Sequence, residues 1–273
     1  MTDCTCNDNK KLEKPLVLQI EKIVDEAKDF RTFIFRHKLN AKPGQFVMLW
    51  IPRMDEKPFS ITYQDKERFA LTVFKIGKFT KKLFTLKEGD KVGIRGPYGN
   101  SFKLEGKKVV LVGGGCGTAP LGFLAEELKK KKADVNFIIG AKSKSYLLYL
   151  KRMKKSGIKT FVTTDDGSFG VKGFTTELLK TFIEKNKLSK VYACGPEVML
   201  KHVVNMCLEA KVPCEISMER YMKCGFGVCG QCCVDNTGVR VCKEGPIFSA
   251  KQIKKITEFS KYKRSASGKK VGL

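Results

Sequence analysis

Residues 109–120, VVLVGGGCGTAP, decide the fold of this chain. The apolar run Val109–Val112 predicts a buried strand, and an amphipathic helix is expected to follow the glycines up to about Lys130. A glycine-rich turn from a strand into a helix leaves free amide groups at the helix N-terminus, where such sheets bind a dinucleotide pyrophosphate. The turn is not a clean G-x-G-x-x-G, so its position between strand and helix carries the argument. Its candidate cofactor-binding residues are Gly114, Gly115, Gly117 and Thr118.

Strands and helices alternate after this turn, with further strands expected at Val135–Ile139, Thr160–Val162 and Val191–Ala193. This alternation predicts a doubly wound parallel sheet over residues 105–212. Polar loops follow two of these strands, and because the carboxyl ends of parallel strands share one sheet edge, the loops should meet the glycine-rich turn there. Their candidate binding residues are Asp166 in the first loop and Cys194, Gly195 and Pro196 in the second.

The preceding part of the chain, residues 12–104, consists of short apolar runs separated by turn signals and predicts a small antiparallel barrel. In this barrel Lys57–Thr62 offers a cation, a proline turn and a hydroxyl, and a short helix is expected over Thr80–Leu86. These features fit a flavin phosphate site and a barrel strand capped by a proline turn about equally well. The expected strands are Leu16–Ile20, Phe33–Phe35, Phe46–Ile51, Phe69–Phe74 and Lys91–Ile94.

Four cysteines near the C-terminus have the spacing C-x4-C-x2-C-x9-C, which is typical of a plant-type 2Fe–2S cluster. They are Cys224, Cys229, Cys232 and Cys242, and we assign them as the metal ligands. The intervening glycines allow the loop to fold around a cluster and to direct amide groups at its sulfurs. A zinc site is the weaker alternative because only Cys229 and Cys232 form a C-x2-C pair. The gap from Cys232 to Cys242 requires a tight hairpin over Asp235–Gly238.

The other cysteines carry no assigned role. Cys233 fits the spacing less well than Cys232 and is interpreted as a neighbour of the cluster. Cys4 and Cys6 lie in a polar N-terminal segment that has a disordered composition. Disulfides are disfavoured because no signal peptide precedes the chain.

The net charge is +25, but the basic residues are dispersed along all 273 residues without a nucleic-acid motif. We therefore expect no nucleic-acid partner, since a binding footprint should be clustered. No apolar run approaches the length of a membrane span, which predicts a soluble cytoplasmic protein. A cluster module is expected over residues 213–250. The basic segment 251–273 is expected to be a flexible solvated end when free, or a clamp for an acidic subunit.

The order of barrel, nucleotide domain and cluster segment resembles the ferredoxin-reductase superfamily, and within it the electron-transfer subunit of class B dihydroorotate dehydrogenase. The resemblance implies FAD in the barrel, NAD on the parallel sheet and a 2Fe–2S cluster in the C-terminal module. The family's R-P-x-S flavin motif corresponds to Lys57, Pro58, Phe59 and Ser60, with Lys in place of Arg. The resemblance also implies flavin contacts from Thr72, Val73, Phe74, Gly77 and Thr80, with Phe79 in place of a glycine.

The resemblance further implies an oxidoreductase subunit of pyrimidine biosynthesis that passes electrons from an FMN-containing, dihydroorotate-oxidising catalytic subunit to NAD⁺. The partners would form a two-plus-two heterotetramer. No catalytic residue is expected in this chain, and His37 and His202 are interpreted as structural. The alternative is the flavin and cluster reductase subunit of a cytoplasmic hydrogenase or sulfur-metabolising complex. Electron-bifurcating ferredoxin–NADP reductases typically carry Asp at the position of Cys224, which argues against them.

Overall fold

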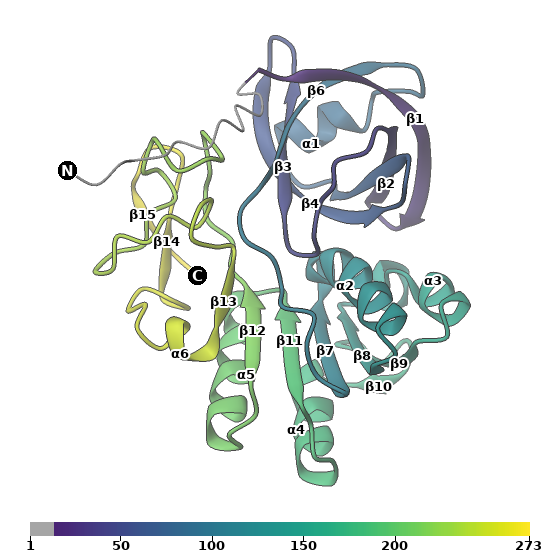
Figure 1. Cartoon of the computed structure of the whole chain (residues 1–273), viewed down its shortest axis with the longest axis vertical. Coiled ribbons are helices and arrows are strands. Elements are labelled where there is room, and N and C mark those ends of the chain that lie inside the picture. The colour runs from purple at the N-terminus through teal and green to yellow at the C-terminus, as the bar shows by residue number, and fades with distance from the viewer. Residues whose placement is uncertain (1–13) are drawn as a thin grey trace, which may run out of the picture.

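A computed structural model describes residues 14–273, and Cys4 and Cys6 lie outside this range. The first part of the described chain is a closed antiparallel barrel, seen at the top of Figure 1, with strand order β1-β2-β5-β4-β3-β6. Phenylalanine and aliphatic side chains from alternate positions of these strands fill its interior. The strands are β1 (Leu16–Ala27), β2 (Phe30–Arg36), β3 (Phe46–Ile51), β4 (Asp55–Gln64), β5 (Arg68–Phe74) and β6 (Lys91–Tyr98).

The barrel contains one strand that the sequence pattern did not predict. Lys57–Thr62, expected either to form a flavin phosphate site or to cap a barrel strand with a proline turn, lies inside the continuous strand β4, where Pro58 pairs with Met48 of β3. Pairing of β4 with β5 begins only at Ile61, so Pro58 lies where its missing N–H has no ladder partner to lose. The short helix α1 (Lys78–Leu83) ends before the predicted Leu86.

The second unit is a seven-stranded sheet in the order β10-β9-β8-β7-β11-β12-β13, and all neighbours pair in parallel except the edge strand β13. Helices pack on both of its faces: Val109 and Leu111 point toward the core beneath α2, while Val110 and Val112 point toward the core beneath α4 and α5. The predicted doubly wound sheet is confirmed. Its elements are β7 (Lys108–Gly114), η1 (Gly115–Gly117), α2 (Thr118–Lys130), β8 (Asp134–Ala141), η2 (Lys144–Tyr146), α3 (Leu150–Lys155), β9 (Lys159–Thr164), β10 (Val171–Lys172), α4 (Thr175–Lys185), β11 (Lys190–Cys194), α5 (Glu197–Glu209), β12 (Cys214–Ser217) and β13 (Ile247–Ser249).

The cysteine-rich segment between β12 and β13 is folded largely without regular secondary structure. An antiparallel bridge joins Cys233 and Arg240, and Asn236 and Gly238 adopt positive φ in the turn between them. This is the tight hairpin that the ligand spacing required.

The C-terminal segment differs from the flexible end expected of it. It forms helix α6 (Ala250–Ile253) and the hairpin β14 (Tyr262–Arg264) and β15 (Lys270–Gly272), which lies against the cysteine-rich segment (Figure 1). Asp235 holds this hairpin through Tyr262 Oη at 2.6 Å and Arg264 Nη2 at 2.8 Å. These hydrogen bonds, first that from Tyr262, hold the pKa of Asp235 well below its usual range.

Of the helices among residues 14–273, none combines the length and apolar content that crossing a membrane requires.

A buried ion-pair network fixes the junction between the sheet and the cysteine-rich segment. Arg220, just after β12, pairs with Glu197 at the start of α5 and with Glu258 in the C-terminal segment, the latter at 2.8 Å. The side chains of all three are almost completely buried. Glu258 also accepts the Asp235 amide at 2.7 Å, and Glu197 accepts that of Ser260 at 2.9 Å. One arginine therefore connects the sheet, the cysteine-rich segment and the C-terminal hairpin.

We expect Arg220→Met to lower the free energy of unfolding by about 3–5 kcal/mol, because it leaves two buried carboxylates without their cation. Guanidinium denaturation followed by circular dichroism measures the change. Lys180→Met is the control: Lys180 forms an exposed pair with Glu184, whose loss should cost less than about 1 kcal/mol. Equal stability of the two variants would contradict the structural role assigned to Arg220.

Candidate functional site

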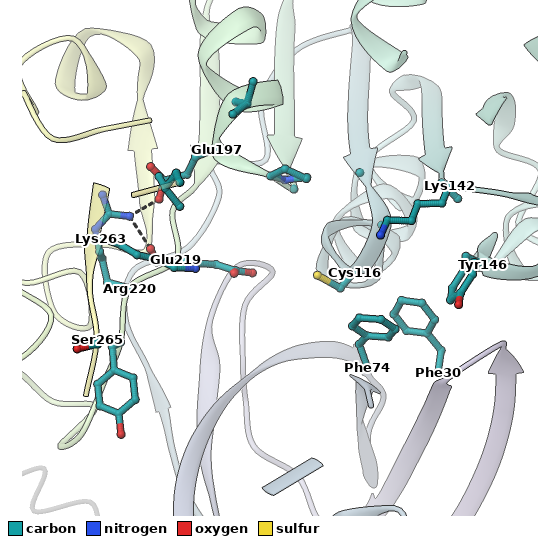
Figure 2. A pocket seen from close by; sticks show the side chains of 18 of the residues that line it. Phe30, Phe74, Cys116, Lys142, Tyr146, Glu197, Glu219, Arg220, Lys263 and Ser265 are labelled. Carbon is teal, nitrogen blue, oxygen red and sulfur yellow. Dashed lines mark hydrogen bonds and ion pairs between the residues drawn. The ribbon is translucent and has the colours of Figure 1, made fainter. Parts of the chain in front are cut away.

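A cavity of about 740 Å³ lies where the barrel, the parallel sheet and the cysteine-rich segment meet (Figure 2). The barrel contributes Phe30 and Phe74, whose rings stack with centroids 4.7 Å apart. The sheet contributes the glycine-rich turn and the start of α5, and the segment after β12 contributes Glu219, Arg220 and Tyr221. The remaining lining residues include Ala141, Lys142, Tyr146 and, from the C-terminal hairpin, Lys263, Arg264, Ser265 and Leu273.

The glycine-rich turn and the Cys194–Pro196 turn, predicted to meet at one sheet edge, are in direct contact. A Cβ at Gly117 would lie 2.2 Å from the Cys194 carbonyl oxygen, and one at Gly114 would lie 2.8 Å from Met199 Sδ. Only glycine fits at Gly117, where the contact is with backbone, so the glycine-rich turn packs its backbone against the Cys194–Pro196 turn as a cradle. Thr118 at the start of α2 has a buried hydroxyl oxygen with no hydrogen-bond partner among the described residues. A free hydroxyl, a helix N-terminus and this cradle together fit a dinucleotide pyrophosphate.

Asp166 lies at the same sheet edge but does not line the cavity. Its carboxylate accepts hydrogen bonds from the Ser168 amide at 2.9 Å and from the Ser168 hydroxyl at 2.6 Å. These bonds, first that from the hydroxyl, lower the pKa of Asp166, so the side chain is an anion at neutral pH. Ser168 Oγ in turn accepts the Lys144 amide at 2.8 Å. The loop is therefore a compact acidic turn beside Lys142, which does line the cavity.

Cys116 and Glu219 both line the cavity. Figure 2 shows Glu219 and Cys116 extending toward each other from opposite walls. Desolvation raises the pKa of Cys116 to about 12, and the charge of Glu219 adds to that effect. Desolvation also raises the pKa of Glu219 and of the neighbouring Cys194, a buried thiol. Burial thus keeps the Cys194 thiol protonated at neutral pH.

The predicted flavin residues on β4 and β5 lie just beyond the stretch over which these strands pair, which runs from Ile61 with Leu71 to Gln64 with Phe69. Lys57 Nζ pairs with Asp55 at 2.5 Å and donates to Tyr221 Oη at 3.1 Å, beside the cavity. Burial opposes it, but the bond to Asp55 raises the pKa of Lys57, so a cation is held there. Phe59 stacks on Phe79, which occupies the position of the family's glycine, with ring centroids 5.9 Å apart.

The side chains of the two predicted threonines are already engaged. Thr80 Oγ1 accepts the amides of Ile76 at 2.9 Å and of Gly77 at 3.0 Å, and so closes the turn before α1. Thr72 Oγ1 bonds to the hydroxyls of Thr32, Thr62 and Tyr149. Any flavin contact from these positions must come from the backbone, as the resemblance implies for Thr72, Val73 and Phe74.

The four predicted ligand cysteines form two pairs, Cys224 with Cys229 and Cys232 with Cys242. Within residues 14–273 no three Cys, His, Asp or Glu side chains form a group suited to a single metal ion. Burial opposes ionisation of Cys224, but the amides of Cys229, Phe226 and Val228 donate to its sulfur and lower its pKa to about 6. The contact with Cys242 lowers the pKa of Cys232 to about 7, and the Cys242 amide donates to the Cys232 sulfur at 3.3 Å.

Cysteines paired in this way, two of them with sulfurs that accept backbone amides, fit a 2Fe–2S cluster, in which each iron takes two terminal thiolates. Cys233 has a different environment: its thiol donates to the Gly238 carbonyl at 3.7 Å. Burial, together with the charge of Cys232, raises its pKa. The structure thus separates Cys233 from the four candidate ligands.

Sequence reasoning missed Glu219, Tyr221 and the hairpin residues that line the cavity. No motif marks them, because they reach the cavity through the Arg220 and Asp235 contacts rather than through local sequence.

Comparisons with known proteins follow the same division of the chain. Residues 17–102 match the oxidoreductase FAD-binding domain, residues 111–205 the oxidoreductase NAD-binding domain, and residues 219–254 the iron-sulfur cluster binding domain of dihydroorotate dehydrogenase B. A relative from Methanocaldococcus jannaschii, named a probable dihydroorotate dehydrogenase B (NAD(+)) electron transfer subunit, is 48% identical over 95% of this chain and 99% of its own. One of the same name from Methanothermobacter thermautotrophicus is 44% identical over 94% of this chain and 97% of its own.

Among solved structures, an NADH-dependent reduced ferredoxin–NADP oxidoreductase is similar, with a TM-score of 0.78 and 30% identity, and covers 89% of this chain and 94% of its own. The FAD/NAD-binding domain of a nitric oxide dioxygenase from Vibrio cholerae has a TM-score of 0.64 at 19% identity over 72% of this chain and 93% of its own. This second likeness concerns the fold.

We expect Cys232→Ser to lose most of its bound iron and its visible cluster absorbance, because serine offers a poorer ligand for iron than a thiolate. Cys233→Ser, the matched control one residue away, should keep both. Iron and acid-labile sulfide analysis of anaerobically purified protein measures the outcome. If C232S kept its iron and C233S lost it, the assignment would be wrong, and Cys233 would be the ligand in place of Cys232.

Proposed function

The chain belongs to the family of dihydroorotate dehydrogenase B electron-transfer subunits, and we propose that it passes electrons from a dihydroorotate-oxidising, FMN-containing subunit through a 2Fe–2S cluster and FAD to NAD⁺. The product, orotate, is a pyrimidine precursor. One observation carries the proposal: a single cavity is lined by the barrel, the glycine-rich turn and the segment that leads into Cys224. FAD exchanges single electrons with a cluster and hydride with NAD.

The residues of this chain bind and orient the cofactors. We assign FAD to Lys57, Pro58, Phe59 and Ser60 on β4, to the backbone of Thr72, Val73 and Phe74 on β5, and to Gly77 and Thr80 at α1. NAD is assigned to the cradle of Gly114, Gly115, Gly117 and Thr118, to the turn of Cys194, Gly195 and Pro196, and to Asp166. Lys57 supplies the fixed cation on the barrel side, and the glycine cradle supplies backbone amides on the sheet side. We assign no catalytic role to Cys116 or Cys194.

The catalytic subunit is proposed to bind over residues 224–232, which we call the cysteine loop. Val228, between the two cysteines of the first pair, has a side chain 77% exposed, and Cys229 next to it is also exposed. An exposed apolar residue beside a surface cysteine fits a contact through which single electrons enter.

A cytoplasmic location belongs to the same proposal. The cysteines among residues 14–273 are free thiols, and thiols persist in compartments that are kept reduced.

The purified chain is expected to oxidise NADH with an artificial electron acceptor and to show no dihydroorotate oxidation by itself. NADH should reduce its flavin faster than NADPH, since the anionic Asp166 turn repels a 2′-phosphate. Orotate formation should appear only when the FMN-containing catalytic subunit from the same source is added. Anaerobic spectrophotometry of both reactions measures this. Orotate formation by the chain alone, or recovery of hydrogenase subunits in a pull-down from the native source, would contradict the proposal.

A further inference from the structure

Arg95, on β6 of the barrel, reaches out of its own domain to the first candidate cluster ligand. Its side chain is only 9% exposed and forms a two-pronged pair with Glu56 of β4, one arm of which measures 2.7 Å. Its Nη2 atom also donates to the backbone carbonyl of Cys224 at 3.1 Å. A barrel arginine thus fixes the peptide that follows a ligand cysteine.

The surroundings of Arg95 form a close contact between the barrel and the cysteine loop. The guanidinium carbon lies 5.6 Å from the ring centroid of Phe226 in the loop and 5.9 Å from that of Tyr98 on the barrel. Between them, Gly225 lies so close to the barrel that a Cβ there would be 2.7 Å from Met48 Cγ. The loop is therefore seated on β3 and β6 at the residue next to Cys224.

The partner of Arg95 connects this contact to the flavin side of the barrel. Glu56 immediately precedes Lys57, the cation assigned to the flavin site, and the two side chains have different partners. Glu56 binds Arg95, while Lys57 reaches Tyr221, three residues before Cys224. Two neighbouring residues of β4 are thus both linked to the start of the cysteine loop.

A buried pair of this kind is poorly explained by stability of the barrel alone. Taking an arginine and a glutamate out of water costs free energy, and an apolar pair of similar size often serves stability equally well. An arginine that also binds the main chain of a ligand residue has a further effect. Hydrogen bonds and charges next to a metal ligand set its orientation and tune the metal.

We propose that Arg95 is a positioning residue for the cluster: paired with Glu56, it fixes the Cys224 peptide on the flavin barrel. This inference rests on the proposed function, because it presumes a cluster on the loop. Two consequences follow. The separation between flavin and cluster is held constant, and electron transfer slows steeply as that separation grows. Arg95 also balances the charge of Glu56 next to the loop; without it, the unpaired carboxylate would disfavour the reduced, more negative cluster and lower the reduction potential.

The test compares the wild-type chain with Arg95→Met, Arg95→Lys and Arg31→Met, each purified anaerobically. Arg31 is a matched control on the same barrel: it pairs with Asp25 at 2.6 Å, donates to the Phe84 carbonyl at 2.8 Å and lies over the Phe84 ring. All of these partners belong to the barrel itself. Iron content, the cluster potential from a dye-mediated titration followed by EPR, and stopped-flow rates after mixing with NADH are the readouts.

In Arg95→Met we expect flavin reduction by NADH to be unchanged. Transfer from flavin to cluster should slow by about 10-fold or more, and the cluster potential should move to a lower value. Arg95→Lys keeps the charge but lacks the planar fork, so it should restore the potential and leave the transfer slow. Arg31→Met should match the wild type in every readout. Loss of iron from Arg95→Met with full iron in Arg31→Met would also support the proposal, because the loop would then fail to present its ligands.

Wild-type potential and wild-type transfer rate in Arg95→Met would overturn the proposal. So would equal damage in Arg31→Met, since the effect would then reflect the barrel in general. A wild-type chain that binds no iron would instead refute the proposed function, and the two failures are thereby distinguished.

Discussion

The buried pairs of Arg220 with Glu197 and Glu258 are the interaction on which the geometry of the site depends. Glu197 begins α5 directly after the Cys194–Pro196 turn, and Glu258 holds the Asp235 amide of the cysteine-rich segment. Because removal of one member would leave uncompensated charge in a buried position, these three parts of the chain cannot shift independently. The same arginine precedes the cavity residue Tyr221, so the network sets where the sheet ends and where the cysteine loop begins.

The sequence predicts those parts of the structure whose constraints are local. The turn at residues 113–118 needs glycine because its backbone lies against the Cys194 carbonyl, and such a requirement is visible as a run of glycines between a strand and a helix. The cysteine spacing is likewise local, since a short loop must bring four thiolates together. Its hairpin over Asp235–Gly238 was predicted for the same reason and is present.

The parts that the sequence did not predict depend on partners far away along the chain. Pro58 suggests a turn, but it pairs with Met48 of β3 in a strand. The strand tolerates a proline there because β5 does not pair with β4 at this position, so no hydrogen bond is lost with the missing N–H. The C-terminal segment carries many lysines and was expected to be solvated. Asp235, about thirty residues earlier in the chain, neutralises part of that charge through Arg264 and Lys270 and holds the hairpin beside the cavity. Such pairings become apparent only once the fold has brought the segments together.

The cysteine loop illustrates how these distant partners act on the chemistry of a site. The carbonyl of Gly227 accepts a hydrogen bond from Arg240 Nη1 at 2.8 Å, while the amide at the other end of that peptide, Val228 N–H, donates to the Cys224 sulfur. A guanidinium thus binds the negative end of a peptide dipole, whose positive end points at a thiolate. Arg95, from the barrel, binds the Cys224 carbonyl. Because carbonyl oxygens would repel an anionic cluster, turning them outward onto arginines is as necessary as turning the amides inward, and the ligand motif alone specifies neither arginine.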